Sequence, residues 1–317
     1  MRIIITGGTG MIGRRLANEM ARDGHELIVL SRSPKLAEGL DAAVRVEGWD
    51  AKTAKGWGPL ADGADVIVNL AGANLAGEGF FPTRWTDERR KVLVESRINA
   101  GQAVVEAVTM AARKPALVIQ ASAIGYYGPR GNEEVTEDTA PGTDFAAQVC
   151  IDWEKSTEAV EAMGVRRAII RTGVVLSFEE GALYRMALPF RMFVGGTFGS
   201  GRQQFSWIHP ADEIGAIRFL IKHTEASGPF NLTAPNPLSN AEFSRVLGRV
   251  MSRPSLIPVP GFAFKTAFGD VADILLTGQR VLPARLLDLG YTFQFADAED
   301  ALADLYRDET ALRVQAH

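Results

Sequence analysis

The sequence predicts an α/β fold, a doubly wound parallel sheet with a smaller α+β domain at its C-terminal side. Over residues 1–177, short β-branched segments alternate with helical patterns, which is typical of a parallel sheet with helices on both faces. A glycine-rich turn separates the first segment from the first helix. Further along, loops rich in glycine, proline and aromatic residues replace the alternation. We therefore expect a sheet domain at 1–177, completed by segments around 204–233, a C-terminal region at 178–305 and a tail at 306–317.

The first helix is expected directly after the glycine turn. Ile12, Leu16 and Met20 recur every four residues, which gives a helix one apolar face. Gly24 is placed to end it, because glycine readily adopts the left-handed conformation of a helix C-terminus. Short apolar runs predict four strands in this part of the chain, at 2–6, 26–31, 44–47 and 64–71.

A long helix is expected from Arg84 to about Ala112, before Pro115. Ser239 or Asn240 can cap a later helix that ends before Pro254. The same periodicity arguments predict further strands at 116–122, 167–176, 205–208 and 229–233, and further helices at 145–163 and 210–222.

Composition and charge narrow the function classes. The chain of 317 residues is 46% hydrophobic and 23% charged, an ordinary globular mixture. Its net charge of −4, without basic runs, argues against nucleic-acid binding. No apolar run reaches the ~18–20 residues of a membrane helix, and the apolar N-terminal run is too short for a signal peptide. The single cysteine, Cys150, cannot form an internal disulfide, so we expect a cytoplasmic protein. We expect the protein to be a monomer or a homodimer. The four histidines lie too far apart in the sequence to predict a metal site.

The glycine turn is the most specific local motif. Gly7, Gly10 and Gly13 stand three apart between a strand and a helix. In a Rossmann-type turn the first glycine allows the tight bend and the second allows a pyrophosphate to approach the backbone. The third allows the helix to pack closely on the strand. The N–H groups at the helix N-terminus would bind the phosphates. This context predicts a bound dinucleotide.

The end of the second strand indicates which dinucleotide. An NAD site usually has Asp or Glu there, to accept hydrogen bonds from the ribose hydroxyls. This chain has Ser31-Arg32-Ser33, and an arginine can pair with a 2′-phosphate. The cofactor expected is therefore NADP(H). Asp50, after the third strand, has two interpretations: an acceptor for the adenine amine or an exposed loop acid.

Several motifs together resemble a known family. Leu30-Ser31-Arg32, Asn69-Leu70-Ala71-Gly72 and Ala121-Ser122-Ala123-Ile124-Gly125-Tyr126-Tyr127-Gly128 look like the extended branch of the short-chain dehydrogenase/reductase superfamily. More specific stretches resemble its atypical "epimerase family protein" group, whose members end in a C-terminal domain of unknown function. The resemblance spans residues 1–305 and implies an NADP-binding Rossmann fold without an established substrate. The stretches that carry it are Arg84-Trp85-Thr86, Ser96-Arg97-Ile98, residues 171–176, 206–209 with Asp212, 228–231, 278–283 and 290–293.

The turn, the strand ends and the resemblance together define the expected cofactor contacts. They are Gly7, Thr9, Gly10, Met11, Ile12, Gly13, Arg32, Asp50, Leu70, Ala71, Gly72, Ser122 and Val174.

The catalytic motif of the superfamily is absent. That motif is a Ser or Thr after the fifth strand and a Tyr-x-x-x-Lys, in which the lysine lowers the tyrosine pKa. When the helix is aligned on Glu154, Ala146 and Cys150 occupy the tyrosine and lysine positions. Ser122 lies one residue before the expected hydroxyl position. The candidate catalytic residues are therefore Ser122, Tyr126 and Tyr127, and for the two tyrosines a packing role is the alternative.

Other polar residues also have two interpretations each. Arg202, in a glycine-rich loop, is either a substrate contact or an exposed arginine. Arg84 either approaches the substrate or fastens a loop. Cys150 is either a redox group or a small buried side chain. His209 and Asp212 form either a catalytic pair or a structural one.

Three functions are compatible with these observations. The first is an NADP-dependent oxidoreductase or epimerase that acts on a small polar substrate. The second, suggested by the missing Tyr-x-x-x-Lys, is a non-catalytic sensor of the NADP(H) redox state. The third is a scaffold with a vestigial cofactor site, although the intact glycine turn and Arg32 argue against it.

Overall fold

A seven-stranded parallel sheet forms the centre of the computed structural model, which describes residues 1–77, 79 and 81–315. The strand order is β11-β7-β5-β4-β1-β2-β3. The chain adds β2 and β3 on one side of β1 and then adds β4, β5, β7 and β11 on the other side, as in a doubly wound sheet. The predicted fold class is therefore confirmed. The strands are β1 (Arg2–Thr6), β2 (Glu26–Ser31), β3 (Arg45–Gly48), β4 (Val66–Asn69), β5 (Leu117–Ala123), β7 (Arg166–Thr172) and β11 (Gly228–Leu232).

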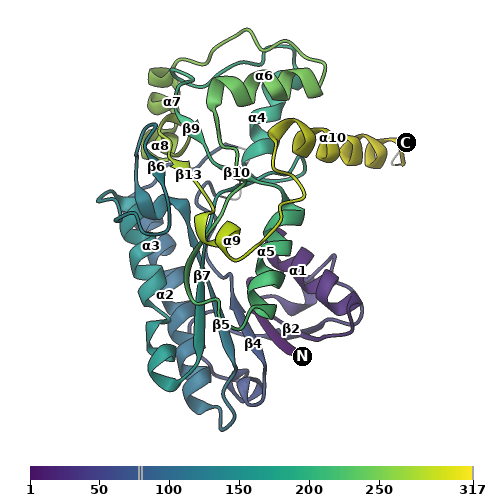
Figure 1. Cartoon of the computed structure of the whole chain (residues 1–317), viewed down its shortest axis with the longest axis vertical. Helices are drawn as coiled ribbons and strands as arrows, with labels where there is room; N and C mark the ends of the chain where they lie inside the picture. Colours follow the sequence, from purple (N-terminus) through teal and green to yellow (C-terminus); the bar gives the residue numbers. More distant parts are fainter. Residues whose placement is uncertain (78, 80, 316–317) are drawn as a thin grey trace.

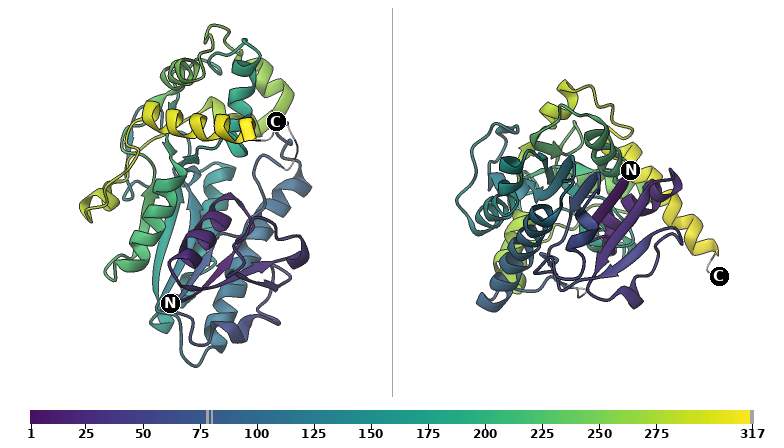
Figure 2. Two further views of the ribbon diagram at one scale, coloured as in Figure 1. Left: turned by 90° about the vertical axis from the view of Figure 1, so that its right-hand side faces the viewer. Right: turned by 90° about the horizontal axis from the view of Figure 1, so that it is seen from below.

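Helices cover both faces of this sheet (Figure 1). On one face lie α1 (Met11–Arg22) and α5 (Pro210–Lys222); on the other lie α2 (Asp87–Met110) and α3 (Phe145–Lys155), as two further views also show (Figure 2). Successive side chains of a strand point to opposite faces, so β1 contributes to two cores. Ile3 and Ile5 pack under α1 and α5, whereas Ile4 packs on the α2 side, and all three are fully buried.

Side-chain caps set the helix starts. Thr86 accepts a hydrogen bond from the N–H of Arg89, so α2 begins at Asp87 and not at Arg84 as expected. Asp144 caps α3 in the same way, by accepting from the N–H of Ala147. His209 caps α5 by accepting from the N–H of Ala211. At α2, α3 and α5, a side chain therefore pairs with one of the N–H groups of the first turn that have no partner within the helix.

Three expected elements are broken in the structure. The helix expected at 145–163 ends at Lys155, and a 3-10 helix, η4 (Glu158–Met163), follows after Ser156 donates to the carbonyl of Trp153. The strand expected at 167–176 divides at Gly173 into β7 and β8 (Val174–Val175). A Cβ at Gly173 would lie 2.8 Å from the carbonyl oxygen of Ser206, so this crossing needs glycine.

The strand expected at 205–208 divides at the other side of that crossing. Its halves, β9 (Gln204–Phe205) and β10 (Trp207–Ile208), pair with different partners, β12 (Leu238–Ser239) and β8. Of the segments around 204–233, β11 is the strand that joins the large sheet, beside β7.

Most of the C-terminal region lies beyond one end of the sheet (Figure 1), whereas its segments α5 and β11 belong to the sheet domain. It has its own core, in which Phe190, Trp207, Phe243 and Leu302 are buried. The tail expected at 306–317 is helical as far as it is described, because α10 continues to Gln315. The remaining elements are η1 (Pro34–Leu36), η2 (Gly58–Ala61), η3 (Ile124–Tyr127), β6 (Glu134–Val135), α4 (Gly181–Arg191), α6 (Asn240–Val250), α7 (Gly261–Phe268), η5 (Gly269–Ala272), α8 (Asp273–Leu276), β13 (Arg280–Val281), α9 (Ala284–Asp288) and α10 (Ala298–Gln315).

The described residues offer neither a membrane-spanning helix nor a cluster of metal ligands. None of their helices combines the length and apolarity needed to cross a bilayer. They also contain no group of three or more His, Cys, Asp or Glu side chains that could hold a metal ion.

Candidate functional site

The glycine turn between β1 and α1 brings three stretches of backbone into contact. Gly7 has a φ of +66°, and a Cβ there would lie 2.8 Å from the carbonyl group of Leu70 at the end of β4. A Cβ at Gly13 would lie 2.5 Å from the carbonyl oxygen of Gly7. At Gly10, by contrast, a Cβ would meet only that oxygen, at 3.4 Å. The turn is therefore closed at Gly7 and Gly13 and open at Gly10.

The open side of the turn is the N-terminus of α1. Gly10 is the N-cap without a side-chain hydrogen bond, and the first turn of α1 has no acidic residue. The N–H groups of this turn and the positive end of the helix dipole thus favour an anion. Thr9 is exposed here, while Met11 and Ile12 are half-buried. These residues fit a dinucleotide phosphate.

The end of β4 is held against the turn by hydrogen bonds. Thr6 donates from its hydroxyl to Asn69 at 2.6 Å and accepts from the N–H of Ala71 at 3.2 Å. Beyond this point the chain is exposed at Gly72. The structure therefore brings the expected contacts Leu70, Ala71 and Gly72 beside the glycine turn.

Arg32 and Asp50 differ in whether their charged groups have partners within the described residues. Arg32 is exposed at the end of β2, and it has neither a hydrogen bond nor an ion pair within the described residues. The carboxylate of Asp50 accepts from the N–H groups of Lys52 and Thr53, each at 2.8 Å, and from the Thr53 hydroxyl. Hydrogen bonds from the Thr53 backbone chiefly hold the pKa of Asp50 below its ordinary value. Arg32 is the freer of the two to bind a ligand.

A cavity of about 650 Å³ lies where β5 and β7 end, under the segment 261–279. Val174, an expected cofactor contact, lines it. The charged, aromatic and small side chains of its wall include Trp85, Arg90, Arg97, Phe145, Ala146, Val149, Cys150, Trp153, Thr172, Lys265, Asp270 and Asp273.

The positions of the missing catalytic pair face this cavity. Both Ala146 and Cys150 line it. Burial raises the pKa of the Cys150 thiol to about 11, so it remains a neutral thiol near pH 7. The place of the Tyr-x-x-x-Lys pair therefore holds a methyl group and a thiol that stays protonated, and neither can act as a general base at that pH.

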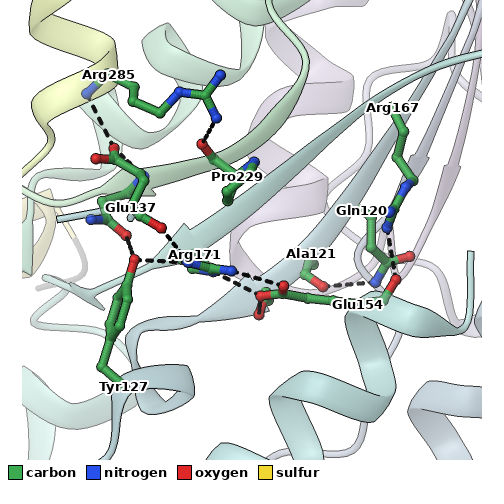
Figure 3. Close-up of polar contacts among 11 residues, drawn as sticks. Gln120, Ala121, Tyr127, Glu137, Glu154, Arg167, Arg171, Pro229 and Arg285 are labelled. Carbon is green, nitrogen blue, oxygen red and sulfur yellow. Dashed lines mark hydrogen bonds and ion pairs between the residues drawn. The ribbon is translucent and has the colours of Figure 1, made fainter. Parts of the chain in front are cut away.

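Two of the three candidate catalytic residues, Ser122 and Tyr127, belong to a buried hydrogen-bond network, of which Figure 3 shows Tyr127, Arg171 and Glu154. Ser122 donates to the carboxylate of Glu154 at 2.7 Å. The hydroxyl of Tyr127 donates to Asn231 at 2.6 Å and accepts from Arg171 at 3.0 Å. Burial raises the pKa of Tyr127 to about 12.

Arg171 is the centre of that network. It forms two hydrogen bonds with Glu154, at 2.9 and 3.0 Å, and its guanidinium lies 3.5 Å from the ring centre of Tyr126. Burial by itself lowers the pKa of Arg171, but Glu154 outweighs it and the pKa is raised. Neither Ser122 nor the two tyrosines line the cavity, and this favours the packing role for Tyr126 and Tyr127.

The expected substrate contacts Arg202 and Arg84 lie outside the cavity wall. Arg202 is exposed, although its neighbours Gln203 and Gln204 line the cavity. Arg84 donates to the carbonyl groups of Thr266 and Ala267 in α7. It thereby fastens the loop before α2 to the segment that covers the cavity.

His209 and Asp212 serve different neighbours and do not bond to each other. His209 accepts from the N–H of Ala211 and caps α5, and burial lowers its pKa to about 4. Asp212 accepts from the N–H groups of Gln294 and Phe295. This geometry favours the structural interpretation of both.

Charge inside the cavity is balanced at two of its three cations. Arg90 pairs with Asp270 at 2.6 Å, and Lys265 pairs with Asp273 at 3.0 Å. Arg97 has no ion pair within the described residues. Its guanidinium donates to the carbonyl of Leu93 at 2.9 Å and lies 4.8 Å from the Trp153 ring centre.

Arg97 belongs to the motif Ser96-Arg97-Ile98, from which the sequence predicts no role for it. The available signal was periodicity: Leu93, Arg97, Ala100 and Val104 lie on one buried face of α2. A charged residue at a position that the helical period assigns to the core indicates a special environment.

Comparisons with known proteins agree with this geometry. The model of the "NAD dependent epimerase/dehydratase family" matches residues 3–233, and that of a "domain of unknown function (DUF1731)" matches 259–305. The chain belongs to the NAD dependent epimerase/dehydratase family. Within it, "Epimerase family protein YfhF" of Bacillus subtilis is 38% identical over 97% of this chain and 99% of its own length. An Arabidopsis thaliana chloroplastic homologue is 39% identical over 95% and 86%. The predicted membership of the "epimerase family protein" group is thus confirmed.

Solved structures of epimerase family members show the same fold. The human epimerase family protein SDR39U1, crystallised with NADPH, superposes with a TM-score of 0.85 at 32% identity, over 96% of this chain and 99% of that one. A UDP-glucuronic acid 4-epimerase from Bacillus cereus, in complex with NAD, gives a TM-score of 0.75 at 16% identity, over 97% and 96%. The second likeness shows the fold alone.

Proposed function

We propose that the chain binds NADP(H) at the glycine turn and acts as an oxidoreductase or epimerase on a small molecule bound in the adjoining cavity. The observation that carries the proposal is a pair of anion-binding features at one edge of the sheet: the turn is open at Gly10 beside the α1 N-terminus, and Arg32 at the end of β2 is unpaired within the described residues. The first would hold the pyrophosphate and the second a 2′-phosphate. The NADPH bound to the human relative supports the same cofactor.

When bound, the nicotinamide cofactor supplies or accepts hydride. The protein's part is to position the two ligands and exclude water. Thr172, at the end of β7, and Val174, in β8, would contact the nicotinamide end, and the lining of the cavity by both residues supports this. The segment 261–279 covers the cavity, so it can shield the reacting atoms from solvent.

Calorimetric titration of the full chain with NADPH and NADH tests the cofactor. NADH lacks the 2′-phosphate, so Arg32→Ala should weaken NADPH binding by about tenfold or more and leave NADH binding nearly unchanged. Arg249→Ala is a matched control, because Arg249 is exposed and pairs with Glu299 far along the chain. An equal loss for both nucleotides in Arg32→Ala would contradict the role of Arg32. Failure of wild type to bind either nucleotide would refute the proposal and favour a scaffold.

A specific observation also favours a second function, the redox sensor. Ala146 and Cys150 replace the acid–base pair at the cavity, and Ser122 and Tyr127 are engaged elsewhere. Following NADPH oxidation with a panel of small carbonyl compounds separates the two functions. Turnover of any compound supports the enzyme. No turnover, together with affinities for NADPH and NADP⁺ that differ by about tenfold, supports the sensor, since equal affinities could shift no equilibrium.

A further inference from the structure

We propose that Arg97 is the anion-binding residue of the cavity, and that the second ligand is a small organic acid with one carboxylate and an apolar body. This inference rests on the proposed function, which it deepens by naming a substrate class and a contact. It also goes beyond the substrate contacts expected from the sequence, Arg84 and Arg202.

A comparison of the buried arginines singles out Arg97. Three arginines of the described chain are buried: Arg97, Arg167 and Arg171. Arg167 pairs with Glu161 at 2.7 Å and Arg171 with Glu154 at 2.9 Å. Arg97 is 6% exposed and lacks such a partner within the described residues. It is also the one of the three that lines the cavity.

The hydrogen-bonding capacity of Arg97 is largely unused. A guanidinium has five N–H donors, and that of Arg97 makes one hydrogen bond, to the carbonyl of Leu93. A buried charge is costly unless it is paired, and here burial lowers the pKa of Arg97 to about 10. Nε and Nη2 have no hydrogen-bond partner among the described residues, yet neither atom is fully enclosed, and the Arg97 side chain lines the cavity. A carboxylate would satisfy them in pairs.

The carboxylates already in the cavity are committed elsewhere. Asp144 accepts from the N–H of Ala147 as the cap of α3. Asp270 and Asp273 hold Arg90 and Lys265. Among the three cations of the cavity wall, Arg97 is therefore the one that has no ion pair within the described residues and can offer its charge to a ligand.

The remaining wall near Arg97 is apolar. Trp85 and Phe145 lie edge to face with ring centres 5.3 Å apart, and Val149 and Trp153 complete this side. Such a wall favours an apolar body, while one arginine fixes the orientation of the carboxylate.

The anion is assigned to a second molecule and not to the cofactor. No residue of the turn 7–13, and not Arg32, lines the described cavity, so the cofactor phosphates have their own positive groups outside it. Arg97 lies beneath Gly72, where a Cβ would be 3.2 Å from its side chain. This places the bound carboxylate beside the strand end where the cofactor is expected.

Calorimetry on the NADPH-saturated full chain tests the inference. The probes are acetate, isobutyrate and benzoate, with benzyl alcohol as the uncharged counterpart of benzoate. Each protein is first titrated with NADPH alone. The variants are Arg97→Met, which removes the charge at similar length, and Arg97→Lys, which keeps the charge without the fork. Arg249→Met is the control at an exposed arginine.

The expected result is saturable binding of at least one carboxylate, with benzoate about tenfold or more tighter than benzyl alcohol. Arg97→Met should weaken carboxylate binding by about tenfold or more, with NADPH affinity within about twofold of wild type, and Arg97→Lys should be intermediate. The melting temperature of Arg97→Met should not fall, because an unpaired buried charge is removed.

Three results would overturn the inference. One is that NADPH binds normally but none of the carboxylates does. Another is that Arg97→Met weakens NADPH as much as the carboxylate, which would make Arg97 a cofactor contact. The third is a lower melting temperature of Arg97→Met with unchanged carboxylate binding, which would make it structural. Failure of the wild-type protein to bind NADPH is a separate outcome, because it refutes the proposed function itself.

Discussion

At the scale of single residues, the glycines of the turn do two different jobs. Gly13 is small because backbone lies against it: a Cβ would be 2.5 Å from the carbonyl oxygen of Gly7 and 2.6 Å from the Cα of Gly8. Gly10 has a φ of −78°, which any residue can adopt, and has open space on its outer side. Gly10 is therefore small for the sake of a ligand and Gly13 for the sake of packing.

The two glycines should respond differently to alanine. Gly13→Ala should lower the free energy of unfolding by about 1–3 kcal/mol, because backbone atoms cannot move aside as a side chain can. Gly10→Ala should unfold like wild type but bind NADPH about tenfold or more weakly, since its Cβ occupies the ligand side. Urea unfolding and calorimetry check both. Weak binding in both variants with equal stability would contradict this division.

The catalytic candidates that sequence position suggested do not line the cavity. Ser122 lies near the end of β5 and Tyr127 shortly after it, so proximity along the chain to the strand end that borders the cavity made them candidates. The ion pair between Glu154 and Arg171 turned both hydroxyls inward. No local pattern contains that information, because Glu154 and Arg171 belong to different elements, α3 and β7.

At the scale of elements, the first turn of α5 contains a buried acid. Glu213 is fully buried and accepts from the Thr172 hydroxyl at 2.9 Å, while its second oxygen has no partner among the described residues. Burial raises its pKa from the ordinary 4.5 to about 8. The helix is thus anchored to the end of β7 through a carboxyl group that stays protonated near pH 7.

This anchor makes stability depend on pH. The unfolded chain loses the Glu213 proton near pH 4.5, whereas the folded chain keeps it to about pH 8. The stabilisation is therefore complete below the first value and is lost as pH rises through the second.

Glu213→Gln should remove the dependence. The free energy of unfolding of wild type minus that of Glu213→Gln should fall by about 1 kcal/mol or more between about pH 5 and about pH 8. Urea unfolding across this range provides the measurement, and the exposed Glu158→Gln is the control. A difference that is flat or rises with pH would show that Glu213 is ionised in the folded chain.

Local patterns predicted the elements well where contacts are local. The helix at 210–222 was predicted with the bounds of α5, because His209 and Pro210 define its start. The strands at 167–176 and 205–208 were predicted without their breaks, because these follow from the crossing of Gly173 and Ser206. Strand propensity depends on neighbouring residues, so it cannot predict a crossing between Gly173 and Ser206, which are far apart in the sequence.

At the scale of the whole molecule, long-range polar contacts hold the C-terminal cover on the sheet domain. Arg84 donates to two carbonyl groups of α7, and Arg90 pairs with Asp270 in η5. Both arginines precede or begin α2, more than a hundred residues earlier in the chain. The cavity therefore exists between parts that these contacts bring together.

Arg84→Ala should loosen this cover without unfolding the sheet domain. Hydrogen–deuterium exchange of residues 261–277 should become several-fold faster, because the removed bonds restrain α7, while exchange in α1 stays unchanged. Arg249→Ala should leave both regions as in wild type. Equal acceleration in α1 and α7 would indicate global destabilisation and contradict a local fastening role.

The sequence by itself determined the fold class, the glycine turn and the family, because each depends on short-range periodicity or on residues adjacent in the chain. It also showed that the catalytic tyrosine and lysine positions hold Ala146 and Cys150. Only the tertiary structure decided that Ser122 and Tyr127 face inward, that Arg84 fastens a cover, and that Arg97 is a buried cation in a cavity. Such roles depend on which distant charges find partners, and that is settled when the elements pack.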